Sequence, residues 1–506
     1  MNNSSITKSF SLLTILTLFE KVIAFVFQAI IASLFGASAE IDAYFSSSEL
    51  FGVFEVAVIS TLTVAALNKF VYHLNSEGES EAFAFLSKLL SFYIPIVTIL
   101  SAGIFVFALP FSYLTAPGFS KEARDTLVLC IRVMAIIPII ECFTAVGMAV
   151  LRQKKRFGIT GLKSLFISVV GIVFVVVCFK LKINPAAMLS VAYVISMLLF
   201  CILTMIYVRK YGELQLLKPK IDSEIKATLG TILPLIVSYG ITRATMMIGK
   251  IIASFLGNGA VSQLTYAHSL YAVVSAVFVT NLTTILLTDF NELLVVKAYR
   301  KVGDKIESVV SIMTILLVPI TIVSVVCSED VVRIVYERGQ FTPDITGVVA
   351  KVLAVYALGF IPAMIHGIYN QVFYAVGDTK TPMWIALVNI IINISLSLLL
   401  IGKIGLLSVA AASMLSSMVA SVLCGIKVKK YLIGYRGCYS VKFIGSCILA
   451  GIVCIISTLC VKMVELHSLF SFIVTTIVAF LTFVLVLLVL KVPNLITGIQ
   501  KLKRNK

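Results

Sequence analysis

The sequence is poor in charge and in polar connecting segments. Only 13% of its 506 residues are Asp, Glu, Lys or Arg, whereas 60% are hydrophobic. A soluble protein of this length could not bury so much apolar side chain. No stretch between the apolar segments exceeds about 20 residues, which excludes a soluble catalytic domain. The chain is therefore expected to be a membrane protein and not an enzyme.

Cysteine and histidine are also used without a metal-binding pattern. The ten cysteines are dispersed, with no CxxC pair, and the four histidines show no metal-like spacing. We expect no metal or cofactor, and we interpret the cysteines as small apolar packing residues. No ATP-binding loop of the G-x-x-x-x-G-K-[ST] type occurs either. Any transport would then depend on an ion gradient, the membrane potential or the gradient of the cargo.

What the chain has instead is a long series of apolar runs. Each run is continuously apolar over roughly 20 residues, enough for a helix to cross a bilayer, and lacks the alternation of barrel strands. The sequence predicts an all-α polytopic membrane protein with about fourteen transmembrane helices. The predicted spans are 9–35, 43–68, 84–109, 126–150, 158–179, 184–207, 227–255, 262–288, 306–327, 348–375, 382–402, 404–426, 441–461 and 467–490.

The net charge of +17 is unevenly distributed between the loops. With a cytoplasmic N-terminus, about eight cations fall on the outer side, Lys121, Arg124, Arg333 and Arg338 among them, roughly a third of the cytoplasmic number. Both termini are therefore predicted to be cytoplasmic, in a bacterial inner membrane. Nucleic-acid binding is not expected, because there is no soluble basic domain to carry it. The cytoplasmic cations are Arg152, Lys154, Lys155, Arg156, Arg209, Lys210, Lys218, Lys220, Lys226, Lys297, Arg300, Lys301, Lys305, Lys427, Lys429, Lys430, Lys501, Lys503, Arg504 and Lys506.

The chain also contains an internal repeat. Residues 30–36 read IIASLFG and residues 251–257 read IIASFLG. A second pair of motifs has a similar offset. Gly118-Phe119 is followed by Pro138, and Gln340-Phe341 is followed by Pro362. The halves are offset by about 220 residues and six spans, so both have the same orientation in the membrane.

This repeat predicts three parts: a six-helix lobe over 1–221, a second six-helix lobe over 222–434, and a trailing helix pair with a basic tail over 435–506. Two pseudo-symmetric bundles of this kind rock around a central site in secondary transporters. The alternative is that the duplication only built a stable bundle.

Charged and polar side chains inside predicted spans mark candidate sites, because a charge at the centre of a membrane helix costs about 2.5 kcal/mol or more. Cations suit phosphate, and carboxylates suit hydroxyl groups or a coupling cation, so the mixture favours an anionic, sugar-bearing ligand. Structural ion pairing is the alternative for any single residue. The weaker candidates are Arg132, Glu141, Lys163, Lys351 and His366. The candidate substrate-binding residues are Lys21, Gln28, Asp42, Glu55, Arg243, Lys250 and His268, and the candidates for ion or charge coupling are Glu20 and Glu49.

Arg243 and Lys250 are the strongest pair. They are seven residues apart, which places them on one face of a helix, roughly 10 Å apart along its axis. The sequence shows no packing need for two cations in one span, and we predict that they bind a diphosphate. The alternative for Lys250 is an ammonium that reaches an interface.

Several motifs resemble those of one transporter family. LFG at 34–36 followed by DAYF at 42–45, TAPGF at 115–119, YERGQFT at 336–342 and FYAVGDTKTP at 373–382 are similar to segments of the MurJ/MviN lipid II flippases. These belong to the multidrug/oligosaccharidyl-lipid/polysaccharide exporter superfamily. The resemblance covers nearly the whole chain, including the trailing helix pair.

The resemblance implies a flippase that moves an undecaprenyl-diphosphate-linked saccharide from the inner to the outer leaflet by alternating access. The last two spans would then offer a groove for the polyprenyl tail. Members of the family place several arginines in a central cavity, and this chain departs from that pattern. The corresponding positions are Lys21, Phe27, Glu55 and Ser269, whereas Asp42 is retained.

Alternative functions remain open from the sequence. The lost arginines leave room for another cargo, such as an O-antigen, capsule or exopolysaccharide unit on the same lipid carrier. An exporter of small cationic compounds would use carboxylates such as Glu20, Glu49 and Glu55. A membrane glycosyltransferase, ligase or polymerase would need a large external loop, and the longest external segment, about 328–347, is short and amphipathic. The flippase is expected to act as a monomer.

Overall fold

The structure, a computed structural model, describes residues 3–56, 61–219, 221–296, 298–432, 435, 437, 441–464 and 467–490. Of the cations assigned to the cytoplasmic side, Lys220, Lys297 and the four in the basic tail over 491–506 lie outside these residues. The described part of the chain consists of helices and their connections, with no β-strand. It forms two compact units, Met1–Ser262 with Arg338–Gln340, and Gln263–Glu337 with Phe341–Lys506.

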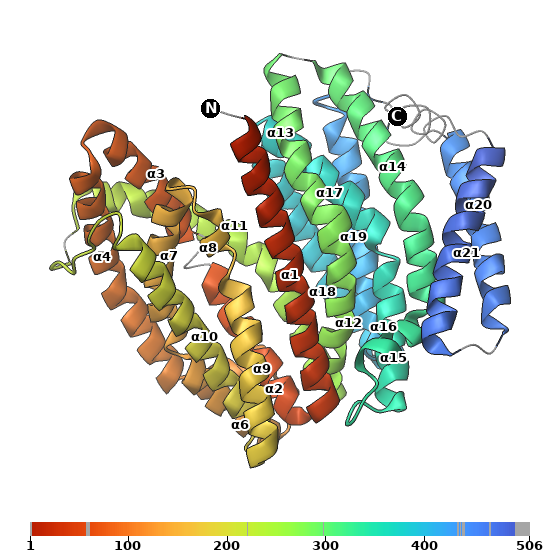
Figure 1. Cartoon of the computed structure of the whole chain (residues 1–506), viewed down its shortest axis with the longest axis horizontal. Helices are drawn as coiled ribbons and strands as arrows, with labels where there is room; N and C mark the ends of the chain where they lie inside the picture. Colours follow the sequence, from red (N-terminus) through yellow and green to blue (C-terminus); the bar gives the residue numbers. More distant parts are fainter. Residues whose placement is uncertain are drawn as a thin grey trace. The chain divides into compact units, whose positions relative to one another are not determined.

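The first unit is built from the N-terminal helices (Figure 1). Ser38 and Asp222 accept backbone N–H groups at the first turns of α2 and α11, which satisfies donors that have no partner within the helix. The helices are α1 (Asn3–Phe35), α2 (Ala39–Glu55), α3 (Thr61–Ser76), α4 (Glu79–Val106), α5 (Ala108–Thr115), α6 (Lys121–Met134), α7 (Ile137–Gln153), α8 (Phe157–Thr160), α9 (Lys163–Leu181), α10 (Pro185–Val208), α11 (Ser223–Ala253) and the 3₁₀ turn η2 (Ser254–Leu256).

The second unit holds the remaining helices. The first turn of α12 lies in the first unit, and a π-helical turn, η3 (Ala276–Thr280), joins α12 to α13. The helices are α12 (Ala260–Ser275), α13 (Asn281–Val295), α14 (Tyr299–Val326), α15 (Ser328–Tyr336), α16 (Pro343–Ala357), α17 (Phe360–Ala375), α18 (Lys380–Ile404), α19 (Leu407–Val428), α20 (Val441–Lys462) and α21 (Ser468–Val489).

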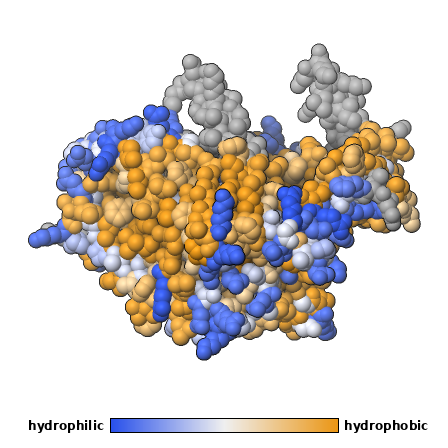
Figure 2. All heavy atoms as spheres, turned by 60° about the horizontal axis from the view of Figure 1, so that its bottom comes forward, coloured by the Kyte–Doolittle hydropathy of each residue, from blue (hydrophilic) through white to orange (hydrophobic). Residues whose placement is uncertain are grey.

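The predicted fold class is confirmed. Among the described residues, each predicted span falls on one helix or on consecutive helical elements, and residues 57–60 of the span predicted at 43–68 lie outside the described residues. Among the described residues, eight helices are long and apolar enough to cross a membrane, and ten spans result if each of two bent helix pairs is one span. The other predicted spans correspond to α1, α2–α3, α11 and α12–α13, which carry the candidate site residues. On the face that Figure 2 shows, hydrophobic side chains cover broad continuous areas and hydrophilic ones gather in separate patches.

The two bent pairs carry the prolines that the internal repeat aligned. Helices α6 and α7 are bent by 40°, with Pro138 in the first turn of α7. Helices α16 and α17 are bent by 42°, with Pro362 near the start of α17. A proline breaks the helical hydrogen-bond ladder, which explains a bend at each position. The same break in both predicted halves agrees with their common origin.

The repeated loop motifs contact each other reciprocally within the first unit. Gly118 donates its backbone N–H to the Ser254 hydroxyl at 3.2 Å, and Gln340 donates its backbone N–H to the Ser33 carbonyl oxygen at 2.8 Å. Ser33 and Ser254 occupy the same position in IIASLFG and IIASFLG. A Cβ on Gly118 would lie 2.4 Å from the Ser254 carbonyl oxygen, and one on Gly339 would lie 2.3 Å from that of Ser33. Each loop therefore approaches the motif of the other repeat at a distance that only glycine allows.

The packing of α11 differs from the division suggested by the repeat. Helix α11 begins the predicted second lobe, yet it packs against α2 and α3 in the first unit. The boundaries predicted at 221/222 and 434/435 stay predictions about the repeat. The consequence for the site is direct, because α11 brings its cations beside the carboxylates of α2.

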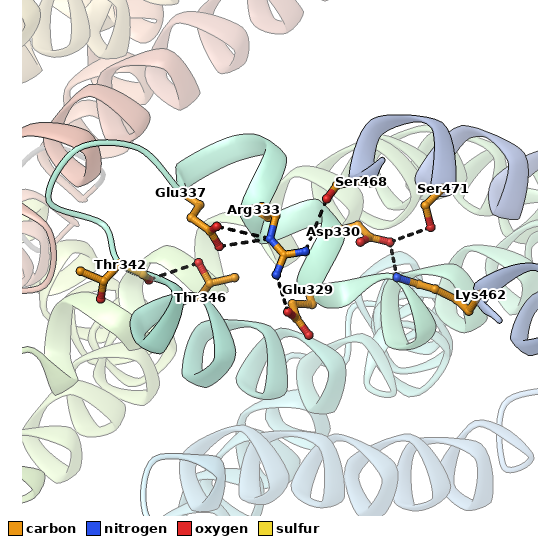
Figure 3. Close-up of polar contacts among 9 residues, drawn as sticks. All are labelled: Glu329, Asp330, Arg333, Glu337, Thr342, Thr346, Lys462, Ser468 and Ser471. Carbon is orange, nitrogen blue, oxygen red and sulfur yellow. Dashed lines mark hydrogen bonds and ion pairs between the residues drawn. The ribbon is translucent and has the colours of Figure 1, made fainter. Parts of the chain in front are cut away.

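Within the second unit, polar contacts attach α15 to the C-terminal helix pair (Figure 3). Helices α20 and α21 pack against each other and against α14. Asp330, nearly buried at 6% side-chain exposure, forms an ion pair with Lys462 and accepts a hydrogen bond from Ser471 at 3.2 Å. Arg333 donates to Ser468 at 3.4 Å. The short amphipathic segment predicted at 328–347 therefore holds the ends of α20 and α21.

Candidate functional site

The strongest predicted pair, Arg243 and Lys250, shares one carboxylate of α2. Glu49 Oε2 lies 2.9 Å from Lys250 Nζ, and Glu49 Oε1 lies 3.5 Å from Arg243 Nη1. Lys250 also donates to the Phe45 carbonyl oxygen at 3.2 Å. The three charged groups carry a formal charge of +1. The expectation that no packing need accounts for two cations on this span was wrong, because Glu49 holds both.

Arg243 is the more accessible cation of this group, which we call the α2/α11 cluster (Glu49, Arg243 and Lys250). The side chain of Arg243 is 35% exposed, compared with 14% for Lys250 and 12% for Glu49. A guanidinium presents five donors in a planar fork that matches carboxylate and phosphate groups. The cluster can therefore bind an anion through a cation that is already positioned by a carboxylate.

Asp42 lies in the same helix as Glu49 but has a different environment. Its side chain is completely buried. Its carboxylate accepts the backbone N–H groups of Gly259 and Ser262, each at 2.6 Å, at the start of α12. A carboxylate at this position satisfies N–H groups that the helix itself leaves free, and it interacts favourably with the helix dipole. Asp42 thus fixes the loop after IIASFLG, and this burial argues for a structural role over substrate contact.

Glu55 belongs to a second charged group, which we call the α7/α9 triad (Glu55, Glu141 and Lys163). Lys163 Nζ lies 2.7 Å from Glu55 Oε1 and 3.2 Å from Glu141 Oε1. Glu141 in α7 is almost fully buried, with a side-chain exposure of 1%. The sequence placed Glu55 with Lys21 and Arg243, whereas the structure pairs it with two residues that we ranked as weaker candidates.

The predicted residues of α1 form no such cluster among the described residues. Lys21 Nζ lies 4.0 Å from Glu20 Oε1, and the Lys21 side chain is 50% exposed. Gln28 is partly buried, and its Oε1 accepts no hydrogen bond from the described residues. An ammonium with this exposure is available to solvent or ligand, and its weak pairing at 4.0 Å costs little to break.

His268 lies in the second unit, in an aromatic group. Its ring centroid is 5.8 Å from that of Tyr271 and 5.7 Å from that of Tyr356. Tyr271 in turn stacks on Phe360 at 4.9 Å. Rings at such distances contribute to packing. The structure thus places His268 in a packed aromatic environment.

The remaining weaker candidates have individual environments. Arg132 lies over the ring of Phe105 at 5.9 Å, a cation–π contact. His366 lies within hydrogen-bond distance of Asn370, at 3.2 Å, in α17. Lys351 is exposed on α16.

Sequence reasoning missed the partners in both charged groups. Glu49 is six residues from Glu55 on one helix, so the two carboxylates lie on different faces of α2. A helical projection of α2 would have separated them, but nothing in the sequence shows that α9 would bring Lys163 to Glu55. Tertiary contacts between α2, α7, α9 and α11 decide these pairs.

The helical fold and its apolar spans define a multi-span membrane protein. In structure, the chain resembles "Lipid II flippase MurJ, inward closed conformation", with a TM-score of 0.80 and 18% identity over 94% of this chain and 97% of that one. It also resembles a multidrug resistance MATE family transporter of the MOP superfamily in its inward-facing conformation, with a TM-score of 0.69 and 14% identity over 83% and 98%. At these identities the likeness shows the fold.

The chain belongs to the MurJ family, whose model, described as "Lipid II flippase MurJ", matches residues 31–487. Among curated proteins, it is 27% identical over 418 residues to the probable lipid II flippase MurJ of Rickettsia prowazekii, which covers 80% of each chain. It is 24% identical over 428 residues to that of Rhizobium meliloti, which covers 83% of this chain and 80% of the relative. The resemblance seen in the sequence motifs is confirmed.

Proposed function

We propose that this protein moves lipid II, an undecaprenyl-diphosphate-linked saccharide, from the inner to the outer leaflet of a bacterial inner membrane by alternating access. Membership of the MurJ family over residues 31–487 supports the cargo class, and the multi-span helical fold supports a transporter. The protein would act as a monomer with both termini in the cytoplasm, as the distribution of Lys and Arg predicts.

The α2/α11 cluster is the part of the structure that we propose binds the diphosphate of the cargo. The cluster has two cations and one carboxylate, so it carries a net formal charge of +1. One of the two cations is the partly exposed guanidinium of Arg243. A diphosphate can take the place of Glu49 on Arg243, with charge-assisted hydrogen bonds of about 1.5–3 kcal/mol each. Glu49 then keeps Arg243 and Lys250 in position between transport cycles.

Other residues are proposed to contribute less directly. Lys21 and Gln28 on α1 and His268 on α12 are proposed as further substrate contacts. Glu20 would modulate the charge of Lys21. Asp42 supports the site by fixing the start of α12, and Glu55 belongs to the α7/α9 triad.

The paired carboxylates also bear on the alternative functions. An exporter of cationic compounds needs accessible carboxylates, but Glu49 and Glu55 each lie within 3 Å of a lysine ammonium, at 2.9 and 2.7 Å. The second candidate cargo is an O-antigen or capsule-type glycan on the same carrier. This cargo is favoured by a difference from the family. The positions at which family members place arginines hold Lys21, Phe27, Glu55 and Ser269 in this chain.

Translocation of fluorescent lipid II in vesicles that contain the purified protein tests the proposal. Arg243→Gln and Lys250→Gln should each reduce the rate at least tenfold, and Arg243→Lys should recover only part of it, because an ammonium lacks the bidentate fork. Lys88→Gln is the matched control, since Lys88 also pairs with a carboxylate, Asp222 at 3.8 Å, on the surface. A double Arg243→Gln, Lys250→Gln variant with the normal rate would show that the pair is structural. The site would then be sought around Lys21, Arg132 and Lys351.

A further inference from the structure

The α7/α9 triad has an unbalanced charge around one fully buried carboxylate, that of Glu141. Two carboxylates, Glu55 and Glu141, surround the single ammonium of Lys163 at 2.7 and 3.2 Å. With all three groups ionised, the triad carries a formal charge of −1. The free energy of burying an ion is high unless opposite charge compensates it. The excess charge therefore needs a positive occupant.

One oxygen of Glu141 is the position that this occupant would take. Lys163 contacts Oε1 of Glu141, whereas Glu141 Oε2 is buried and accepts no hydrogen bond from any described residue. A buried carboxylate oxygen without a donor loses its hydration without replacement, which costs about 1–3 kcal/mol or more. This cost applies to the ionised carboxylate, so it favours the neutral, protonated form of Glu141.

Among the described residues, no cation other than Lys163 forms an ion pair with Glu55 or Glu141. The Tyr193 phenol on α10 lies within electrostatic range of Glu55, Glu141, Tyr44 and Arg243. Tyr44 lies on α2, and Arg243 on α11 already pairs with Glu49. The neutral phenols do not compensate the excess negative charge.

We propose that Glu141 is a proton-binding site, with Glu55 and Lys163 as its connection to water. In the binding step, a hydronium ion gives its proton to Glu141 Oε2, one O–H bond forms, and a water molecule leaves. Release is the reverse. Glu55 and Lys163 are 26% and 15% exposed, compared with 1% for Glu141, so they are the members of the triad through which a proton would enter.

A proton fits this site better than a metal ion does. Among the described residues, no group of three or more His, Cys, Asp or Glu could hold a metal. A monovalent or divalent metal needs about six oxygen ligands, and at Glu141 it would face the Lys163 ammonium. A proton needs one oxygen and brings no second positive centre against the lysine.

The charge state of the triad also bears on transport, and this part rests on the proposed function. Protonation of Glu141 removes one of the two ion pairs of Lys163. The ammonium group then pairs with Glu55 alone. Glu55 and Glu49 lie six residues apart on α2, so a change in the triad acts on the helix that carries the α2/α11 cluster. Proton binding would thereby couple to diphosphate release.

Infrared spectroscopy of the purified full-length protein tests proton binding without any transport assay. A protonated carboxyl group has a C=O stretching band that a carboxylate lacks. The wild type should show a pH-dependent band that Glu141→Gln removes and that Glu122→Gln, a change in an exposed carboxylate of α6, leaves intact. An unchanged band in Glu141→Gln would overturn the proposal, as would loss of the band on addition of Na⁺ at constant pH.

A second variant keeps the test decisive if Glu141→Gln fails to fold. Lys163→Gln retains both carboxyl groups but removes the ammonium, so the midpoint of the band's titration should move to higher pH by one unit or more. Lys163→Arg should restore the wild-type midpoint. A midpoint that is the same in Lys163→Gln and wild type would contradict the proposal.

Vesicles with different internal and external pH then test the coupling. A wild type that flips lipid II faster with a pH gradient, together with a Glu141→Gln variant that has lost this acceleration, is the expected result. Equal acceleration in both proteins would overturn the coupling. A wild type that moves no lipid II would refute the proposed function, while the infrared band would still report on proton binding.

Discussion

Gly118 donates its backbone N–H to the hydroxyl of Ser254 at 3.2 Å, and its α-carbon faces the Ser254 backbone with no room for a side chain. A methyl group there would lie 2.4 Å from the carbonyl oxygen and 2.6 Å from Phe255 Cα. We expect Gly118→Ala to destabilise the protein by about 1–3 kcal/mol, because backbone atoms cannot move aside as a flexible side chain can. Thermal unfolding in detergent measures the effect.

Gly103→Ala is the matched control for this prediction. A Cβ at Gly103 has no heavy atom within 4 Å, and the residue lies inside α4, where alanine is favoured by about 1 kcal/mol. The control should unfold at the wild-type temperature or slightly above it. Equal melting temperatures for Gly118→Ala and Gly103→Ala would contradict the close approach of the loop to Ser254.

The α2/α11 cluster predicts opposite effects of one change on stability and on substrate binding. Glu49→Gln leaves Arg243 and Lys250 without their shared carboxylate and should destabilise the fold by about 3 kcal/mol. The same change removes the competitor for the diphosphate, so the apparent KM for lipid II should fall. Restoring stability by adding Lys250→Gln would show energetic coupling in a double-mutant cycle. A KM that rises in Glu49→Gln would mean that Glu49 contacts the cargo.

The ion pairs of His73, at the end of α3 and beyond the predicted span, should contribute to stability in a pH-dependent way. Burial lowers the pKa of His73, but Glu77 at 2.8 Å and Glu224 at 2.5 Å outweigh it, and the pKa is raised above its usual 6.5. A raised pKa in the folded state means that the stabilisation is fully present below about pH 6.5 and is lost as the pH rises through the folded value. The melting temperature of His73→Gln should therefore fall furthest below wild type at low pH. A difference that is constant from pH 5 to 9 would exclude this linkage.

The contacts between α15 and the C-terminal pair predict unequal effects of two neighbouring carboxylates. Asp330, with 6% exposure, pairs with Lys462, so Asp330→Asn should cost about 3 kcal/mol and loosen α20 and α21. Glu329 pairs with Arg333 but is 57% exposed, and Glu329→Gln should cost about 0–1 kcal/mol. Thermal unfolding of both variants compares them directly. A larger loss from Glu329→Gln would reverse the assignment.

Topology is testable by cysteine accessibility in intact cells. In a background with all ten native cysteines replaced by serine, cysteines at Lys154 and Lys301 should react only after the membrane is permeabilised. Cysteines at Lys121 and Arg338 should react from outside. Reaction of any one from the opposite side would break the predicted arrangement of about fourteen spans.

The helices could be predicted from the sequence because a membrane span is set by local composition. The apolar runs of the predicted spans coincide with helices in the described part of the chain, and the repeat aligned the two prolines at which helix pairs bend. The charged groups were predicted less well. Arg243 and Lys250 were expected together because seven residues place them on one helical face. Their carboxylate partner and the Lys163 link between Glu55 and Glu141 depend on which helices become neighbours, which no local pattern encodes.

The reciprocal loops also bear on how such a chain could have arisen. Each copy of the repeat takes a hydrogen-bond partner from the other: Gly118 uses Ser254, and Gln340 uses Ser33. An ancestor with a single copy could make both contacts only as a homodimer, in which one surface served twice. In the present chain the two copies differ at the site, because Arg243 and Lys250 on α11 align with Val22 and Ala29 on α1. The two halves therefore make reciprocal loop contacts but cannot be exchanged for one another at the charged cluster.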